Sequence, residues 1–471
     1  IAAAIWYGIV SRRNDTGPLF EAMGRTVRTM VSDDGSFVRE YVSLLGVLGR
    51  FAGWNLAALA CAAAPVALIL RSLWPAYEGR ELLLFAVLTA TSIAVLVLLK
   101  RRKAQAAGTA RGLSVSDSQF FFIQIAEGAP GFMRQASRLE RRLLGKRLAS
   151  LQVDRPVFVT GLARSGTTKL LELLARANTV ATHRYCDFPF LMAPYLWNRF
   201  FRLFGSAPTP VDRPHRDGIR ITPHSPEAYE EPLWQHFFPW VHRTDRCCLL
   251  TADDRNPEFD AFFDEHIRKI LLIRQGARYL SKGNYNITRI PYLLSLFPEA
   301  RFIVPIRNPV SHVASLVRQH ELFCRYATSD PRVPQYLRAA GHYEFGPQRV
   351  PMAVNASVKA TLEAWMAGDE YRGYALQWNA VYGYLAAWRD SAPDLADHVL
   401  IVRYEDFCAA PQGLMQRMLQ HTELETEGAC IFDHLGEIRQ SSRHRDTEDR
   451  IRDTVWADVH QTAERFGYSR G

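Results

Sequence analysis

A short segment in the first half of the chain combines the residue types that bind phosphate. Residues 156–177 read PVFVTGLARSGTTKLLELLARA, and Gly161 and Gly166 bracket a loop that contains Arg164. A β-branched run precedes this loop, and leucines at helical spacing follow it. A strand, a glycine-bounded loop and a helix N-terminus direct backbone N–H groups and the helix dipole at one point. The sequence therefore predicts an anion-binding loop here.

The loop differs from the one that binds nucleoside triphosphates. The glycine spacing is the same, but the lysine that should follow the second glycine is missing. Thr167 stands there, Lys169 is displaced by two positions, and the cation inside the loop is Arg164. Kinase and ATPase chemistry needs that lysine on the β- and γ-phosphates, so the sequence disfavours this chemistry.

A second segment of phosphate-binding type lies downstream. ARFIVPIRNPVSHVASLVRQH reads as a strand that ends at Arg307 and a helix that begins near Pro309, with Ser315 eight positions after the arginine. A guanidinium and a hydroxyl suit a dianionic phosphomonoester. Taken alone, Arg307 would more simply be a salt-bridge partner and Ser315 a residue on a helix surface.

Together these segments resemble the sulfotransferase family that uses 3′-phosphoadenosine 5′-phosphosulfate (PAPS). A third segment supports this: HVLIVRYEDF is a strand followed by a Tyr-Glu-Asp turn at Tyr404. The resemblance runs from about Arg155 to the C-terminus. It implies an α/β fold, with a mainly parallel sheet, flanking helices and the nucleotide at the carboxyl ends of the strands.

The resemblance also implies roles for individual residues. Arg307 and Ser315 would hold the 3′-phosphate, and Tyr404 would lie against the adenine. Arg164 would stabilise the bridging oxygen of the leaving phosphate, and no metal is required because positioning and positive charge supply most of the catalysis. The 5′-phosphosulfate loop would consist of Arg164, Ser165, Gly166, Thr167 and Thr168.

The general base that takes the acceptor's proton is less well specified by the sequence. Asp187 follows the loop helix at about the distance at which the family often places an acidic residue. His215 is the second candidate, and Glu230 or Glu231 is the third. Lys282, ahead of the Arg307 strand, is expected to touch the nucleotide or the substrate.

The N-terminal part contains two apolar segments that could cross a membrane. Trp54–Leu70 and Leu82–Leu99 are apolar over about 17 and 18 residues, the lower limit for crossing a bilayer. Basic residues flank the pair on both sides, while the loop between them is nearly neutral, which predicts a transmembrane hairpin with both ends in the cytoplasm. A re-entrant or interfacial hairpin and a pair of buried helices are the alternatives.

Length and composition give the organisation. We expect a membrane-associated helical region at 1–105 with its hairpin at 54–99, a helical connector at 106–150 and a sulfotransferase domain at 151–471 on the cytoplasmic side. The net charge of +9 is scattered, so nucleic acid is not an expected partner. The seven cysteines form no CxxC pair and read as reduced thiols.

The expected function is a membrane-anchored, PAPS-dependent sulfotransferase whose acceptor is a small molecule, lipid or glycan. The alternatives are a degenerate sulfotransferase-like membrane scaffold without turnover and a P-loop kinase, which would bind Mg-ATP tightly.

Overall fold

The computed structural model describes residues 113, 115, 117–128, 130–204, 210–425, 428–438 and 445–470. The chain divides into two units, Ile1–Gly145 and Lys146–Gly471. Helix α6 (Asp117–Gly128) belongs to the first unit, and α7 (Pro130–Ala149) runs across the boundary. No helix in the described ranges is both long and apolar enough to span a bilayer. The predicted hairpin at 54–99 lies outside the described residues.

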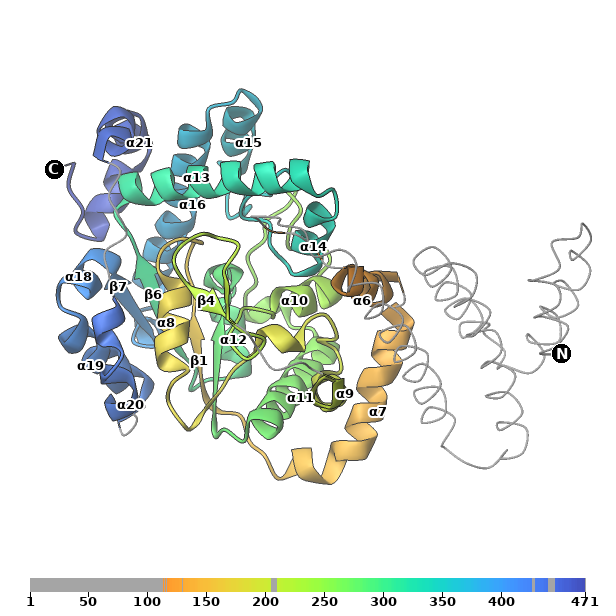
Figure 1. Ribbon diagram of the computed structural model, residues 1–471. Coiled ribbons are helices and arrows are strands. Elements are labelled where there is room, and N and C mark those ends of the chain that lie inside the picture. Colours follow the sequence, from red (N-terminus) through yellow and green to blue (C-terminus); the bar gives the residue numbers. More distant parts are fainter. Residues whose placement is uncertain are drawn as a thin grey trace, which may run out of the picture. The chain divides into compact units, whose positions relative to one another are not determined.

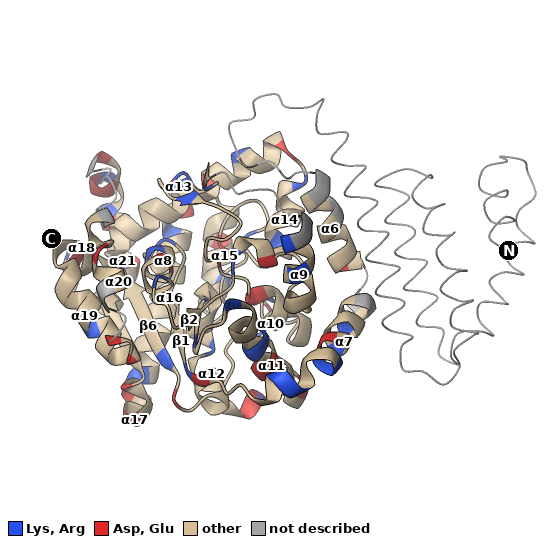
Figure 2. Cartoon of the chain, turned by 60° about the horizontal axis from the view of Figure 1, so that its bottom comes forward, with Lys and Arg blue, Asp and Glu red and all other residues tan. Residues whose placement is uncertain are grey.

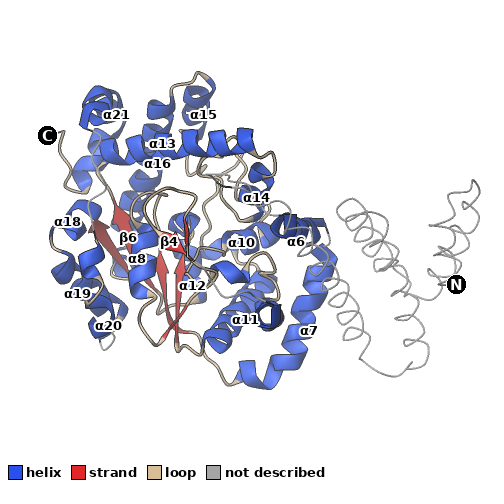
Figure 3. Ribbon diagram, in the orientation of Figure 1, coloured by secondary structure: helices blue, strands red, loops and turns tan. Residues whose placement is uncertain are grey.

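The second unit is built on a parallel sheet of five strands in the order β2-β5-β1-β6-β7. Figure 3 shows the strands with helices around them. The strands are β1 (Asp154–Val159), β2 (Val180–Ala181), β5 (Arg278–Lys282), β6 (Arg301–Ile306) and β7 (Val399–Arg403). This confirms the predicted α/β class. A separate antiparallel hairpin, β3 (Val211–Asp212) with β4 (Arg220–Ile221), was not predicted.

Helices lie around the sheet (Figure 1). They are α8 (Thr167–Leu174), α9 (Pro194–Phe204), α10 (Glu231–Phe237), α11 (Pro257–Arg274), α12 (Ile290–Leu296), α13 (Pro309–Ser329), α14 (Val333–Ala339), α15 (Val358–Met366), α16 (Glu370–Ser391), α17 (Pro393–Ala396), α18 (Tyr404–Ala409), α19 (Pro411–Thr422), α20 (Gly428–Phe432) and α21 (Arg445–Arg465), with short 3₁₀ turns at Tyr185–Asp187, Ala252–Asp254, Asn284–Thr288 and Leu435–Glu437. Basic and acidic residues are interspersed along them (Figure 2).

The two faces of the sheet are covered by different kinds of side chain, aliphatic on one face and aromatic on the other. On one face, alternate strand residues such as Val157, Val159 and Ile303 pack with the leucines of α8 and with Met415 and Met418 of α19. On the other face, the Phe158 ring stacks on the ring of Phe302 and meets that of Tyr279 edge-on. Strands buried on both faces read as continuous apolar runs, as in PVFV of β1 and FIVPI of β6.

Burial on both faces fixes the strands and leaves their carboxyl ends as the place where loops can build a site. The loop after β1, the start of α13 after β6 and the start of α18 after β7 all leave the same edge, because these strands are parallel neighbours.

Candidate active site

The glycine-bounded loop has a backbone with positive φ angles, a conformation that favours glycine. Gly161 has φ 149°, Arg164 φ 72° and Gly166 φ 108°. A Cβ on Gly161 would lie 3.0 Å from the carbonyl oxygen of Pro305, and one on Gly166 would lie 3.0 Å from Cδ2 of Tyr404. Both glycines are therefore needed for close approach as well as for conformation.

Neighbouring elements hold the loop in place. The Thr160 hydroxyl donates to the carbonyl oxygen of Gly283 at 2.7 Å, which ties the end of β1 to the end of β5. Nε2 of His312, on α13, lies 2.8 Å from the carbonyl oxygen of Ala163, which is a hydrogen bond if this nitrogen carries the proton. The Thr167 hydroxyl lies 3.4 Å from Oδ1 of Asn284. The loop is thus held by the segments that follow the two strands flanking β1.

The residues predicted to bind the two ends of the nucleotide meet at this loop. Nε of Arg164 donates to the Ser315 hydroxyl at 3.3 Å. Nη1 of Arg307 lies 3.5 Å from the carbonyl oxygen of Arg164. The guanidinium of Arg307 sits 5.1 Å from the ring centroid of Tyr404, whose edge faces Gly166. The structure therefore brings Arg164, Arg307, Ser315 and Tyr404 together.

Ser165 and Thr168 lie where the loop predicts them. Ser165 is buried, and its backbone N–H donates to the carbonyl oxygen of Leu162 at 3.2 Å. Thr168 is in the first turn of α8, with Gly166 as the residue before the helix. Their backbone groups stand at the N-terminus of α8, where an anion is favoured.

The Tyr-Glu-Asp segment at Tyr404 holds the start of α13, the helix that follows Arg307. Glu405 accepts a hydrogen bond from the backbone N–H of Asn308 at 3.0 Å and another from the Tyr468 hydroxyl at 2.8 Å. Glu405 therefore secures the start of α13. Burial lowers the pKa of Arg307, against the opposing effect of Tyr404 and Glu405.

A set of charged residues beside Arg164 was missed by the sequence analysis. Nη1 of Arg164 forms an ion pair with Asp217 at 2.9 Å, and Asp217 also lies 3.4 Å from Arg213. Arg213 in turn pairs with Glu227 at 3.4 Å. Burial raises the pKa of Glu227, but Arg213 and Lys282 outweigh this effect and lower it to about 2. These side chains form a charged wall over the loop.

Lys282 stands at the end of β5 and belongs to the same wall. It is buried, and its Nζ lies 3.8 Å from Glu227. Burial lowers its pKa, and the charges of Glu227 and Glu344 act in the opposite direction. The charge of Arg164 also lowers the pKa of Lys282. That Lys282 contacts the nucleotide or the substrate stays a prediction.

His215 is the base candidate that lies in this cluster. Its ring centroid is 5.0 Å from that of Phe323 and 5.7 Å from that of Phe345. Burial, followed by the charges of Arg213 and Arg164, lowers its pKa well below the ordinary 6.5. Nδ1 has no hydrogen-bond partner within the described part of the chain. The lowered pKa favours the neutral imidazole, and Nδ1 is not engaged by a neighbouring group among the described residues.

Asp187 has a different environment. Its carboxylate forms an ion pair with Arg274 and accepts hydrogen bonds from Asn198 at 2.7 Å and from the backbone N–H of Arg184 at 2.8 Å. His183 lies 3.3 Å away. Burial raises the pKa of Asp187, but His183 and Arg274 reverse this and hold it below its usual range. Such a carboxylate is fully engaged, which favours a structural role.

The two remaining base candidates are also engaged in the interior. Glu230 accepts hydrogen bonds from the Tyr279 hydroxyl at 2.6 Å and from Asn286 at 2.8 Å. Glu231 accepts two from Arg289, at 2.7 and 2.8 Å, and lies 2.6 Å from His242. Neither carboxylate is offered to a ligand.

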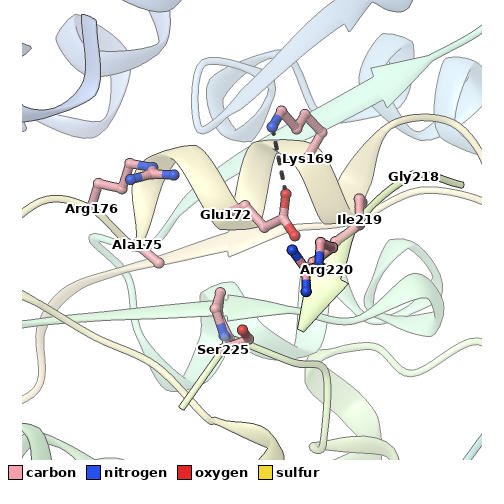
Figure 4. A pocket seen from close by; sticks show the side chains of 9 residues that line it. Lys169, Glu172, Ala175, Arg176, Gly218, Ile219, Arg220 and Ser225 are labelled. Atoms are coloured by element: carbon pink, nitrogen blue, oxygen red, sulfur yellow. Dashed lines mark ion pairs between the residues drawn. The ribbon is translucent and has the colours of Figure 1, made fainter. Parts of the chain in front are cut away.

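A cavity of about 460 Å³ lies along α8, beside the β4 segment (Figure 4). Lys169 and Glu172, 3.7 Å apart, line it with Arg176 and Arg220. None of the predicted site residues lines this cavity. Groups of three or more His, Cys, Asp or Glu side chains that could hold a metal ion do not occur in the described ranges.

Residues 156–344 match the model of the sulfotransferase family. Similar solved structures include the sulfotransferase STF9 of Mycobacterium avium (16% identity, 80% of this chain and 96% of that chain, TM-score 0.45) and STF1 of Mycobacterium tuberculosis H37Rv (17%, 80% and 91%, TM-score 0.39). A third is the sulfotransferase domain of the Synechococcus PCC 7002 olefin synthase (12%, 68% and 96%, TM-score 0.31). No curated protein matches the chain.

Proposed function

We propose that this chain, whose residues 156–344 belong to the sulfotransferase family, moves a sulfuryl group from PAPS to an acceptor. The observation that carries the proposal is that the two elements predicted to bind phosphate meet at one loop. Arg164 contacts Ser315, and Arg307 contacts the backbone of Arg164. One ligand with an anionic group at each end is the simplest partner for such an arrangement.

The residues present fit this donor. The loop N–H groups and the dipole of α8 would take the 5′-phosphosulfate, and Arg307 with Ser315 would take the 3′-phosphate. Two buried donor or acceptor atoms around the loop are also available for a ligand: Nε of Arg213 and Nδ1 of His215 make no hydrogen bond among the described residues. Buried polar atoms rarely lack a hydrogen bond unless a ligand or a water molecule supplies the partner.

The transfer itself needs positive charge and a proton acceptor. The sulfur–oxygen bond to the phosphate breaks as the acceptor oxygen bonds to sulfur, and negative charge grows on the leaving bridging oxygen. Arg164 and Lys282 would stabilise that charge. His215 would accept the acceptor's proton, because its imidazole is neutral and Nδ1 is unengaged.

The acceptor is proposed to carry a hydroxyl or amine on an apolar or glycan body. The rings of Phe323 and Phe345 beside His215 support an acceptor with an apolar portion. The test is to incubate the purified chain with PAPS and a panel of lipids, glycans and small alcohols, and to measure release of adenosine 3′,5′-bisphosphate and the sulfate mass shift. Acceptor-dependent release supports the enzyme; binding without release across the panel favours the scaffold alternative.

We also propose that the two apolar segments, Trp54–Leu70 and Leu82–Leu99, anchor the chain with the catalytic domain on the cytoplasmic side. The full chain should stay with membranes after alkaline carbonate washing. In right-side-out vesicles the domain should resist added protease, and in inverted vesicles it should be cleaved. Release by carbonate would contradict the anchor, and the reverse protease pattern would contradict the orientation.

A further inference from the structure

The guanidinium expected to meet the donor already holds an internal anion. Nη1 of Arg164 donates to Oδ2 of Asp217 at 2.9 Å, and the Asp217 side chain is only 13% exposed. Arg213 approaches the same carboxylate oxygen at 3.4 Å. Asp217 therefore sits between two arginines next to the loop that binds the anion.

The charges around this ion pair make it a strong competitor for an incoming anion. Burial lowers the pKa of Arg164, and the positive charges of Arg213 and Arg307 lower it further. The Asp217 carboxylate acts in the opposite direction and raises it. A guanidinium taken out of water among other guanidinium groups needs an anion nearby. In this structure Asp217 fills that role for Arg164, and Nε of Arg164 is directed at Ser315.

The segment that carries Asp217 is a short loop with unusual backbone angles. Arg216 and Gly218, on either side of Asp217, have φ values of 50° and 80°, and both are exposed. A Cβ on Gly218 would meet nothing within 4 Å, so the loop has open space beside it. The backbone N–H of Arg213 donates to the carbonyl oxygen of Ile219 at 2.9 Å and closes the loop at its base.

We propose that Asp217 is a positioning residue that acts through Arg164, as an internal competitor for the anionic donor. In the empty protein its carboxylate neutralises Arg164 and holds it against Ser315. The 5′-phosphosulfate takes over the guanidinium when it binds, and the carboxylate leaves with its loop. The inference rests on the proposed function, since it assumes that a nucleotide anion binds at Arg164.

The test is the affinity of adenosine 3′,5′-bisphosphate for the full chain, measured by calorimetry. Asp217→Asn removes the competing charge and keeps the size of the side chain, so binding should tighten on the order of tenfold, about 1.4 kcal/mol. Asp217→Glu keeps the carboxylate and should stay near the wild-type affinity. Asp212→Asn removes the same charge from an exposed position of the same hairpin and should also change little.

A double-mutant cycle separates this role from a merely structural one. In an Arg164→Met background, Asp217→Asn should no longer tighten binding, because the partner through which it acts is gone. Unchanged or weaker binding by Asp217→Asn in the wild-type background would overturn the inference, as would equal tightening in both backgrounds. If the wild type itself does not bind the bisphosphate, the proposed function fails together with this inference; if it binds and the cycle fails, only this inference does.

Discussion

Nε of Arg164 donates a hydrogen bond of 3.3 Å to the hydroxyl of Ser315, across 151 residues of sequence. The first residue comes from the loop after β1 and the second from helix α13 after β6. Because β1 and β6 are adjacent parallel strands, the elements that follow them emerge side by side. The two elements that are predicted to bind phosphate thereby lie at one site.

Ser315→Ala should weaken binding of adenosine 3′,5′-bisphosphate by roughly tenfold or more, as expected for a lost hydrogen bond to a charged phosphate. Calorimetric titration of the purified protein measures this. Ser311→Ala is the matched control, since Ser311 lies one turn earlier on α13 and its hydroxyl donates to Glu448 instead. Equal affinities for the Ser315 variant and the wild type would remove Ser315 from the site.

His215→Asn should lower kcat by about 10²- to 10⁴-fold, the range for loss of a general base, while bisphosphate affinity changes by less than about threefold. Steady-state kinetics with a responsive acceptor, alongside calorimetry, separates the two effects. Glu230→Gln serves as the comparison variant, because the Glu230 carboxylate accepts hydrogen bonds from Tyr279 and Asn286 and is not offered to a substrate. A His215 variant with wild-type kcat would show that another group takes the proton.

The acid limb of kcat/KM for the donor should lie below pH 6.5. Burial and the neighbouring arginines lower the pKa of His215 well below 6.5, so the neutral, proton-accepting form persists as the pH falls through that value. Activity should therefore hold its plateau through pH 6.5 and decline only at lower pH, provided that the protein remains folded. A decline centred above pH 6.5 would mean that a different group controls the reaction.

Asp187→Asn should reduce stability far more than catalysis. The variant leaves Arg274 without its buried anionic partner, which costs about 3 to 5 kcal/mol of unfolding free energy. Denaturant unfolding measures the loss, and kcat per folded molecule should remain within a few-fold of the wild type. If stability is unchanged and kcat falls a thousandfold, Asp187 is a catalytic residue after all.

The sequence predicted the parts of the site that local chemistry specifies. The Gly161–Gly166 loop and the strand-to-helix turn at Arg307 are each recognisable within about 20 residues, because glycine, arginine and helix-start signals lie next to one another. That the two meet follows from the parallel sheet, which was also predicted.

The charged wall could not be predicted in the same way. Asp217 and Arg213 lie on a hairpin whose strands have two residues each, too short for an alternating pattern to show. For Asp187, the spacing from the loop suggested a base, but the partner that fixes its role, Arg274, is 87 residues away in the sequence. Only tertiary structure shows such a pairing.

The central claim is that a single nucleotide connects the Arg164 loop to Arg307. Its most direct test compares the affinities of adenosine 3′,5′-bisphosphate and adenosine 5′-monophosphate for the wild type, Arg307→Met and the control Arg301→Met, at the other end of the same strand. The wild type and the control should prefer the bisphosphate on the order of 100-fold, and Arg307→Met should lose nearly all of that preference. A preference that survives in Arg307→Met would contradict the claim.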